Sequence, residues 1–178
     1  MKRGFIFIMT LLLTGYQLGL GAISIADSKV PGLVGGSLIL NEPLTIPGNS
    51  ATVFMQNGQV IAEQQKDQYY ANCRLEVNYP KEQSRTVQAD TFTIYRIERD
   101  QEDVLWQPRR YASNGIILAS GATADKYITV LYLRSPRQTD VTRLTCEYWE
   151  DPTIFPQHLT LQQINNTLGK IFTLKPGS

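Results

Sequence analysis

The chain is short of the residues that most enzyme and metal sites need. Among its 178 residues it has a single histidine, His158, and two cysteines, Cys73 and Cys146. A Ser-His-Asp or Cys-His arrangement would have to use His158, which precedes a helix-start signal and suits a surface or capping role. One histidine and two cysteines also fall short of a four-ligand zinc set. We therefore predict no metal, no cofactor and no catalytic residue, and expect that the protein is not an enzyme.

The chain also lacks a surplus of charge of either sign. It carries 17 Lys and Arg against 16 Asp and Glu, a net charge of +1, and the basic residues are scattered along the sequence. Nucleic acids and anionic lipids bind through concentrated positive charge. We therefore expect no nucleic acid partner and no binding to a lipid surface.

Long apolar runs are absent after the start of the chain. A basic start precedes the apolar stretch 5–13, and small residues follow at 24–26. Polar residues and glycines between 15 and 19 interrupt the stretch before it reaches the roughly 20 apolar residues of a spanning helix. This pattern predicts a signal peptide over 1–26, with cleavage after Ala22 as the alternative site.

The residues Leu13-Thr14-Gly15-Tyr16 are similar to a bacterial lipobox in which Tyr16 occupies the cysteine position. Without that thiol no thioether lipid can form, and ordinary signal sequence explains the same residues. We predict a periplasmic or secreted protein of a Gram-negative bacterium, with no lipid anchor and no stable membrane span after cleavage. Retention of the leader as an anchor is the alternative.

Removing 26 of the 178 residues leaves 152, enough for one domain with its own core. Proline and glycine pairs predict a flexible lead-in over 27–36. We predict a single β-rich domain over 37–174 and a tail over 175–178.

Short runs of β-branched and aromatic residues between turn residues predict an antiparallel fold. The clearest strand is 73–79, in which Arg74 and Glu76 are expected on the outward face with Asn78. The charged segment 98–103 is expected to reverse the chain in a hairpin, and 127–134, apolar on both faces, is expected in the middle of its sheet. The predicted strands are 37–40, 44–46, 51–56, 73–79, 91–99, 115–119, 127–134 and 141–149.

The hydrophobic period changes near the end of the chain. Leucine and isoleucine recur at three- and four-residue steps from 161 to 171, and Thr160 with Gln163 forms a capping box. Gly169 either ends this helix, before a short strand at 171–174, or lies inside a longer one. The predicted fold class is α+β, mainly β: antiparallel sheets or a β-sandwich with one C-terminal amphipathic helix packed on it.

Both cysteines share an alternating face with leucines, Cys73 with Leu75 and Cys146 with Leu144. An oxidising compartment favours their pairing. Closing a loop of about 74 residues would remove unfolded-state entropy equivalent to roughly 4 kcal/mol. We predict a Cys73–Cys146 disulfide, with two separate buried thiols as the alternative.

The candidate binding surface comprises Trp106, Arg109, Arg110 and Tyr111 together with Trp149. Arginine, tryptophan and tyrosine are the residues that most often dominate binding surfaces. Trp149 stands among acidic residues, as aromatic side chains of sugar-binding sites often do. Surface arginines beside a turn, and an aromatic residue at the rim of a strand, would give the same sequence.

Five segments carry a resemblance to a known family: the near-lipobox at 13–16 in the predicted signal peptide, and 73–77, 92–96, 144–146 and 159–164 in the mature chain. Together these segments resemble an uncharacterised family of proteobacterial envelope proteins, periplasmic or lipoprotein-like and of unknown function. The resemblance implies an envelope location and the disulfide, and it implies no activity.

Our leading functional hypothesis is a noncatalytic module that binds another envelope protein or a cell-wall glycan. A second hypothesis is a glycan hydrolase with a carboxylate pair drawn from Glu98, Asp100, Glu147 and Glu150, which requires two of them about 5 to 9.5 Å apart. A third is a secreted enzyme inhibitor that presents a loop held by the disulfide.

Overall fold

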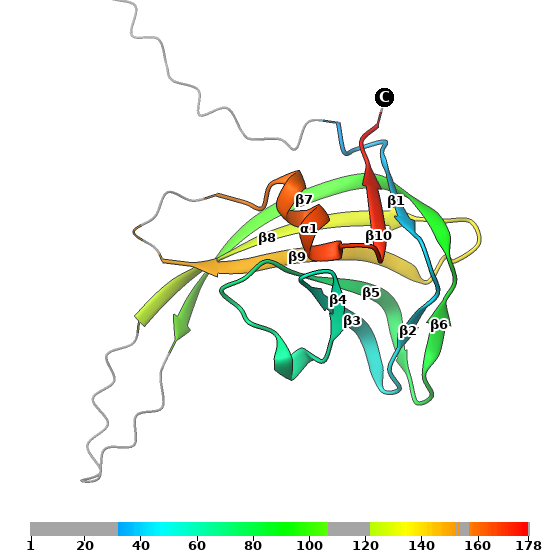
Figure 1. The fold of residues 1–178 in the computed structure, drawn as a ribbon, viewed down its shortest axis with the longest axis horizontal. Coiled ribbons are helices and arrows are strands. Elements are labelled where there is room, and N and C mark those ends of the chain that lie inside the picture. The colour runs from blue at the N-terminus through cyan, green and yellow to red at the C-terminus, as the bar shows by residue number, and fades with distance from the viewer. Residues whose placement is uncertain (1–31, 107–121, 152, 154–156, 178) are drawn as a thin grey trace, which may run out of the picture.

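The computed structural model describes residues 32–106, 122–151, 153 and 157–177, which form a mainly β fold with one α-helix (Figure 1). This confirms the predicted class. The strands are β1 Ser37–Leu40, β2 Leu44–Ile46, β3 Ser50–Gln56, β4 Gln59–Ile61, β5 Asn72–Lys81, β6 Arg85–Val87, β7 Asp90–Trp106, β8 Ala122–Arg134, β9 Val141–Glu150 and β10 Phe172–Lys175. A short 3-10 helix covers Glu63–Gln65, and α1 covers Leu161–Leu168.

Eight strands form one curled antiparallel sheet in the order β10-β1-β7-β8-β9-β5-β3-β4, and β2 pairs with β6 in a small second sheet. Strand β8 is hydrogen-bonded to β7 on one side and to β9 on the other. Its central place confirms the prediction made from its two apolar faces, because a strand covered on both faces needs few polar residues.

The core lies on the inner face of this sheet. Alternation directs Leu75, Leu131 and Leu144 to that face, and the register sets them side by side on β5, β8 and β9, where all three are fully buried. Helix α1 packs there through Ile164 and Leu168, which are also fully buried. Figure 1 shows α1 against the sheet, between β10 and the β3–β4 hairpin.

The predicted helix cap is confirmed. The Thr160 hydroxyl accepts a hydrogen bond from the backbone N–H of Gln163 at 3.3 Å, and the Gln163 side-chain oxygen accepts one from the backbone N–H of Thr160 at 2.9 Å. Gly169 ends the helix with a φ of 55°. The chain then forms β10, so the first of the two alternatives for Gly169 is the one observed.

Helix α1 connects the two edges of the curled sheet. The backbone N–H of Gly58, in the β3–β4 turn, donates to the Thr167 carbonyl at 3.0 Å. A Cβ atom at Gly169 would lie 2.5 Å from the Gly58 Cα, so the turn and the helix end meet backbone to backbone. Because β10 follows α1 directly, one short segment ties β10 to the β3–β4 edge.

The predicted hairpin at 98–103 is wrong. Strand β7 runs without a turn from Asp90 to Trp106, and its residues 98–103 pair one for one with 125–130 of β8. In the segment 98–103 the residues on both faces of this long strand are charged or polar. The alternation of apolar and polar residues that marks a strand is therefore absent from the sequence there. The antiparallel pairing of β7 with β8 continues to Trp106 and Ala122. The predicted strand 115–119 lies outside the described residues.

The last residues of the predicted lead-in are packed against the sheet. Leu33 is fully buried, and the backbone groups of Gly35 and Gly36 are hydrogen-bonded to those of Ile94. The predicted signal peptide, 1–26, lies outside the described residues. No helix in the described part of the chain has the length and apolar character needed to cross a membrane.

Candidate functional site

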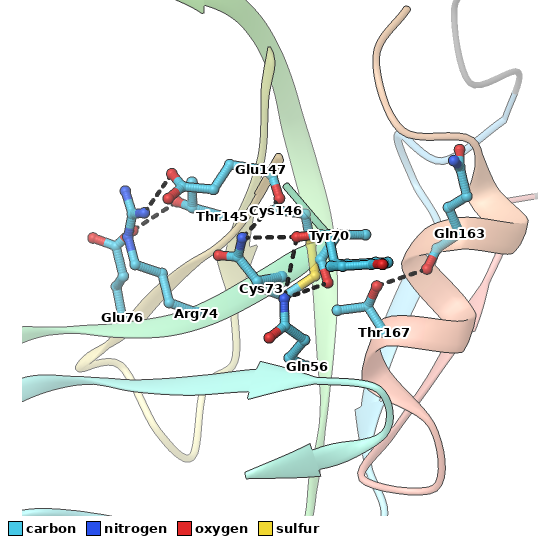
Figure 2. The surroundings of a disulfide bond; sticks show 12 residues. Gln56, Tyr70, Cys73, Arg74, Glu76, Thr145, Cys146, Glu147, Gln163 and Thr167 are labelled. Atoms are coloured by element: carbon cyan, nitrogen blue, oxygen red, sulfur yellow. Dashed lines mark hydrogen bonds and ion pairs between the residues drawn. A yellow bond between two sulfur atoms is a disulfide. The ribbon is translucent and has the colours of Figure 1, made fainter. Parts of the chain in front are cut away.

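Cys73 of β5 and Cys146 of β9 form a disulfide with an S–S distance of 2.10 Å. The two residues lie directly opposite each other in the register of adjacent strands, and both are fully buried. The predicted pairing is confirmed. Figure 2 shows the bond between α1, which carries Gln163 and Thr167, and a group of charged side chains on the other side.

These charged side chains form an ion cluster on the outer face of β5, β8 and β9. The Glu147 carboxylate lies 2.7 Å from the Arg74 guanidinium, 3.0 Å from the Lys66 Nζ and 3.5 Å from the Lys126 Nζ. Its side chain is only 4 % exposed. A buried carboxylate needs such partners, because losing water without them would cost several kcal/mol.

Glu76 extends the cluster along β5. Its carboxylate contacts Arg74 at 3.1 Å and Arg143 at 2.7 Å, and it accepts a hydrogen bond from the Thr145 hydroxyl at 2.6 Å. Glu76, expected on the outward face of its strand, is therefore buried by its neighbours on that face.

Both carboxylates are held in the ionised form. Burial alone would raise the pKa of Glu147, but the charge of Arg74 and the hydrogen bonds from Lys66 and Arg74 lower it below its ordinary value. Burial acts against Glu76 in the same way, and the hydrogen bonds from Arg143 and Thr145 lower its pKa. Neither group is suited to donate a proton at neutral pH.

An open groove of about 680 Å³ adjoins the ion cluster, at the end of the sheet near the β8–β9 turn. Strands β8 and β9 pair only as far as Tyr132 and Arg143, so the segment from Leu133 to the turn separates from β9. The pairings of β7 with β8 and of β5 with β9 each skip one residue, Tyr95 and Thr142. Both skipped residues line the groove. Such bulges redirect side chains and are frequent beside binding sites.

Tyrosine and arginine side chains stack along the groove. The Arg96 guanidinium lies 3.8 Å from the centre of the Tyr132 ring, and the Arg134 guanidinium lies 4.8 Å from the centre of the Tyr95 ring. The Tyr132 hydroxyl donates to Glu98 at 2.5 Å. Each stacked pair holds its guanidinium flat against the tyrosine ring, because electrostatic attraction keeps a cation over an aromatic face.

Arg134 is the available cation of the groove. It is exposed and lines the groove, and it has no carboxylate within ion-pair distance in the described part of the chain. The other arginine of the lining, Arg143, is paired with Glu76. An oxyanion in the groove would therefore meet Arg134 without displacing an existing ion pair.

The turn that forms one end of the groove is held by Asp90. This buried carboxylate accepts hydrogen bonds from the Ser135 hydroxyl at 2.7 Å, the Gln138 amide at 3.1 Å and the Arg137 Nε at 3.0 Å. Burial alone would raise the pKa of Asp90, but these bonds outweigh it and hold the pKa well below its ordinary range. The turn is thereby fixed to the start of β7.

Of the five residues of the predicted binding surface, two, Trp106 and Trp149, lie among the described residues. Trp106 pairs with Ala122 and Trp149 pairs with Lys126, so the tryptophans lie two strands apart and four positions apart along β8. Trp149 is half-buried and contacts Tyr69. The other three members, Arg109, Arg110 and Tyr111, lie outside the described residues.

Of the four carboxylates of the hydrolase hypothesis, two are bound to basic side chains and the other two lie apart from Glu147. Glu98 is bound by Tyr132 and by Arg96, and Glu147 is bound in the ion cluster. Asp100 and Glu147 are both opposite Ile128, two strands or roughly 10 Å apart at the backbone. Glu150 lies three residues after Glu147 and so faces the other side of β9.

Sequence reasoning missed Tyr95, Tyr132 and Arg134 as groove residues. The available signal was the recurrence of tyrosine next to, or two residues from, arginine in two predicted strands. The register that brings those strands together was not readable from the sequence. Among the described residues, no group of three or more His, Cys, Asp or Glu side chains is arranged to hold a metal ion.

Comparison with known proteins gives no family assignment. No protein-family model, no curated protein and no solved structure matches this chain.

Proposed function

We propose that the protein is an exported, noncatalytic binding module of the bacterial cell envelope, and that the groove at Tyr95, Tyr132 and Arg134 receives its partner. The observation that carries the proposal is the exposed Arg134 guanidinium, stacked on Tyr95 and lacking a carboxylate in the described chain. Arginine and tyrosine supply much of the binding energy at protein interfaces. The partner that this chemistry fits best is an envelope protein segment carrying a carboxylate, which a guanidinium binds in bidentate geometry.

Export is proposed from three features. The first is the basic and apolar start of the chain, which has the form of a signal peptide. The second is the Cys73–Cys146 disulfide, since such bonds persist in oxidising compartments. The third is the resemblance of five segments to proteobacterial envelope proteins. The tyrosine at position 16 supports a protein without a lipid anchor.

Binding is favoured over glycan hydrolysis by the state of the carboxylates. An acid catalyst must be protonated near neutral pH, and such groups usually have a raised pKa. The most buried of the four candidate carboxylates, Glu147, has a lowered pKa and three cations around it. Glu98 is bound by a tyrosine and an arginine.

Photo-crosslinking in the native envelope tests the proposal. Replacing Thr139, which lines the groove, with a photo-crosslinking amino acid should give a defined adduct whose partner is identified by mass spectrometry. In the same background, Arg134→Ala should reduce the adduct at least tenfold, because a charge-assisted hydrogen bond contributes about 1.5–3 kcal/mol. Lys170→Ala, which removes an exposed cation outside the groove, should leave the adduct unchanged.

Two results would contradict the proposal. One is an adduct of equal yield in the Arg134 and Lys170 variants, which would show that the groove cation plays no part. The other is cleavage of peptidoglycan by the purified protein that a single Glu98→Gln or Glu147→Gln change abolishes, which would establish the hydrolase instead.

A further inference from the structure

A second open cavity, of about 310 Å³, lies near the opposite end of β9, between that strand, α1 and the segment 69–71. Tyr69, Tyr70 and Tyr148 line it. Tyr69 and Tyr70 are 51 % and 63 % exposed, which leaves two aromatic rings open to solvent. Trp149 meets Tyr69 edge to face with 6.0 Å between ring centres, so the aromatic surface extends past the cavity.

The polar side chains of the cavity are three amides, the hydroxyl groups of three tyrosines and of Thr167, and one carboxylate. The side chains of Asn57 and Asn166 make no hydrogen bond to another side chain or backbone group in the described part of the chain. Gln163 uses its side-chain oxygen for the helix cap, and its amide N–H groups remain available to a ligand. Glu150 completes the lining. Amides provide donors and acceptors together, which matches a ligand rich in hydroxyl groups.

The walls of the cavity are fixed before any ligand arrives. The Gln56 amide donates to the Tyr70 carbonyl at 3.2 Å (Figure 2). It also donates to the Asp67 carbonyl at 2.8 Å, and the two bonds hold the tyrosine segment in place. The Tyr148 hydroxyl donates to the Gln157 carbonyl at 2.6 Å. The Gly58 N–H binds the α1 carbonyl described above. Binding to a rigid site loses little of its energy to ordering.

The disulfide adds to this rigidity. Cys73 follows Tyr70 by three residues and Cys146 precedes Tyr148 by two, so the bond joins the two strands from which the aromatic walls extend. The bond therefore fixes the spacing of the two strands next to the tyrosines.

We propose that this cavity binds an uncharged sugar ring of the N-acetylhexosamine class. The C–H face of a sugar stacks on an exposed tyrosine, while its hydroxyl and acetamido groups bond to the amides and to Glu150. The described lining contains no lysine or arginine, in contrast to the groove at Arg134, so an anionic ligand would find no counter-charge. An extended peptide would find no free strand edge here, because β9 is paired with β5 and β8.

Titration with triacetylchitotriose, an uncharged chain of three N-acetylglucosamine rings, tests this site by NMR. We expect saturable shifts at residues 69–71, 148–150 and 163–167, and unchanged signals around Arg134. Tyr70→Ala should weaken binding about tenfold, since an aromatic contact contributes on the order of one factor of ten beyond its buried area. Tyr70→Phe should retain binding.

The matched control is Tyr79→Ala. Tyr79 is 75 % exposed on β5 and lines neither cavity, so its removal should leave the affinity unchanged. Equal weakening by Tyr70→Ala and Tyr79→Ala, shifts confined to the Arg134 groove, or no saturable binding would each overturn the proposal. Saturation of the same residues by an acidic peptide in place of the sugar would overturn it as well. Because Arg134→Ala should not alter sugar binding, failure here is distinct from failure of the groove.

Discussion

Loss of the disulfide should remove a large part of the stability of this protein. Cys73 and Cys146 are 73 residues apart in the sequence. Cross-linking a loop of that length lowers the entropy of the unfolded chain by about 15 cal/mol/K, or about 4.5 kcal/mol at 25 °C. A domain of this size has a total free energy of unfolding of about 5–15 kcal/mol. The reduced protein should therefore keep its fold with roughly 1–10 kcal/mol of that free energy remaining.

Urea unfolding of the oxidised and the reduced protein measures this effect. With a slope of about 2 kcal/mol per molar urea, the loss should lower the midpoint by about 2 M. The double variant Cys73→Ala/Cys146→Ala should unfold at a slightly lower urea concentration than the reduced protein, because it also removes two sulfur atoms from the core. As a control, reductant should not change the midpoint of the double variant.

A midpoint difference below about 0.5 M between the oxidised and the reduced protein would refute this reasoning. Such a result would mean that the reduced unfolded chain is already compact, so that the bond removes little entropy from it.

Three further substitutions test the remaining structural inferences. Glu147→Gln should lower the free energy of unfolding by about 2 kcal/mol at pH 7, because the cations around it lose their counter-charge. Since folding lowers the pKa of Glu147 from 4.5, its stabilisation is present above that value and lost as the pH falls through the folded pKa; a stability difference that does not shrink in acid would contradict this. Asp90→Asn should cost about 2 kcal/mol and broaden the NMR signals of the β8–β9 turn, and unchanged turn signals would show that the carboxylate does not hold it. Gly169→Ala should lower the free energy of unfolding by about 3 kcal/mol, because its φ is positive and its new Cβ meets Gly58. Gly35→Ala, which also has a positive φ but has open space around its Cβ, should lower it by about 1 kcal/mol. Equal losses in thermal unfolding would refute the close contact between Gly169 and Gly58.

Local sequence patterns were sufficient to predict a strand or helix, and the direction of its side chains, wherever one face of the element is apolar. The alternation around Cys73 and Cys146 places both thiols on the inner face, and the structure pairs them. The three- and four-residue steps near the C-terminus and the Thr160 capping box give α1 with its observed start. In each case the signal lies within about ten residues, so no knowledge of the partner strands is needed.

The same reasoning failed for strand segments that carry polar residues on both faces and for charged residues that are buried by residues of a neighbouring strand. In β7 both faces of the segment 98–103 carry charged or polar residues, so the alternation vanishes although pairing with β8 continues. Glu76 is buried because Arg74, Arg143 and Thr145 surround it, and only the register of β5 with β9 brings two of these within reach.

The sequence by itself determined the strand-rich class, the inward direction of the two thiols and the amphipathic helix, because each depends on the periodicity of one short segment. The tertiary structure alone decided the two cavities. The groove requires Tyr95, Thr142 and Arg134 to meet where two pairings skip a residue and β8 separates from β9. Such meetings depend on strand register across distant segments, and side-chain periodicity along one strand does not record the register.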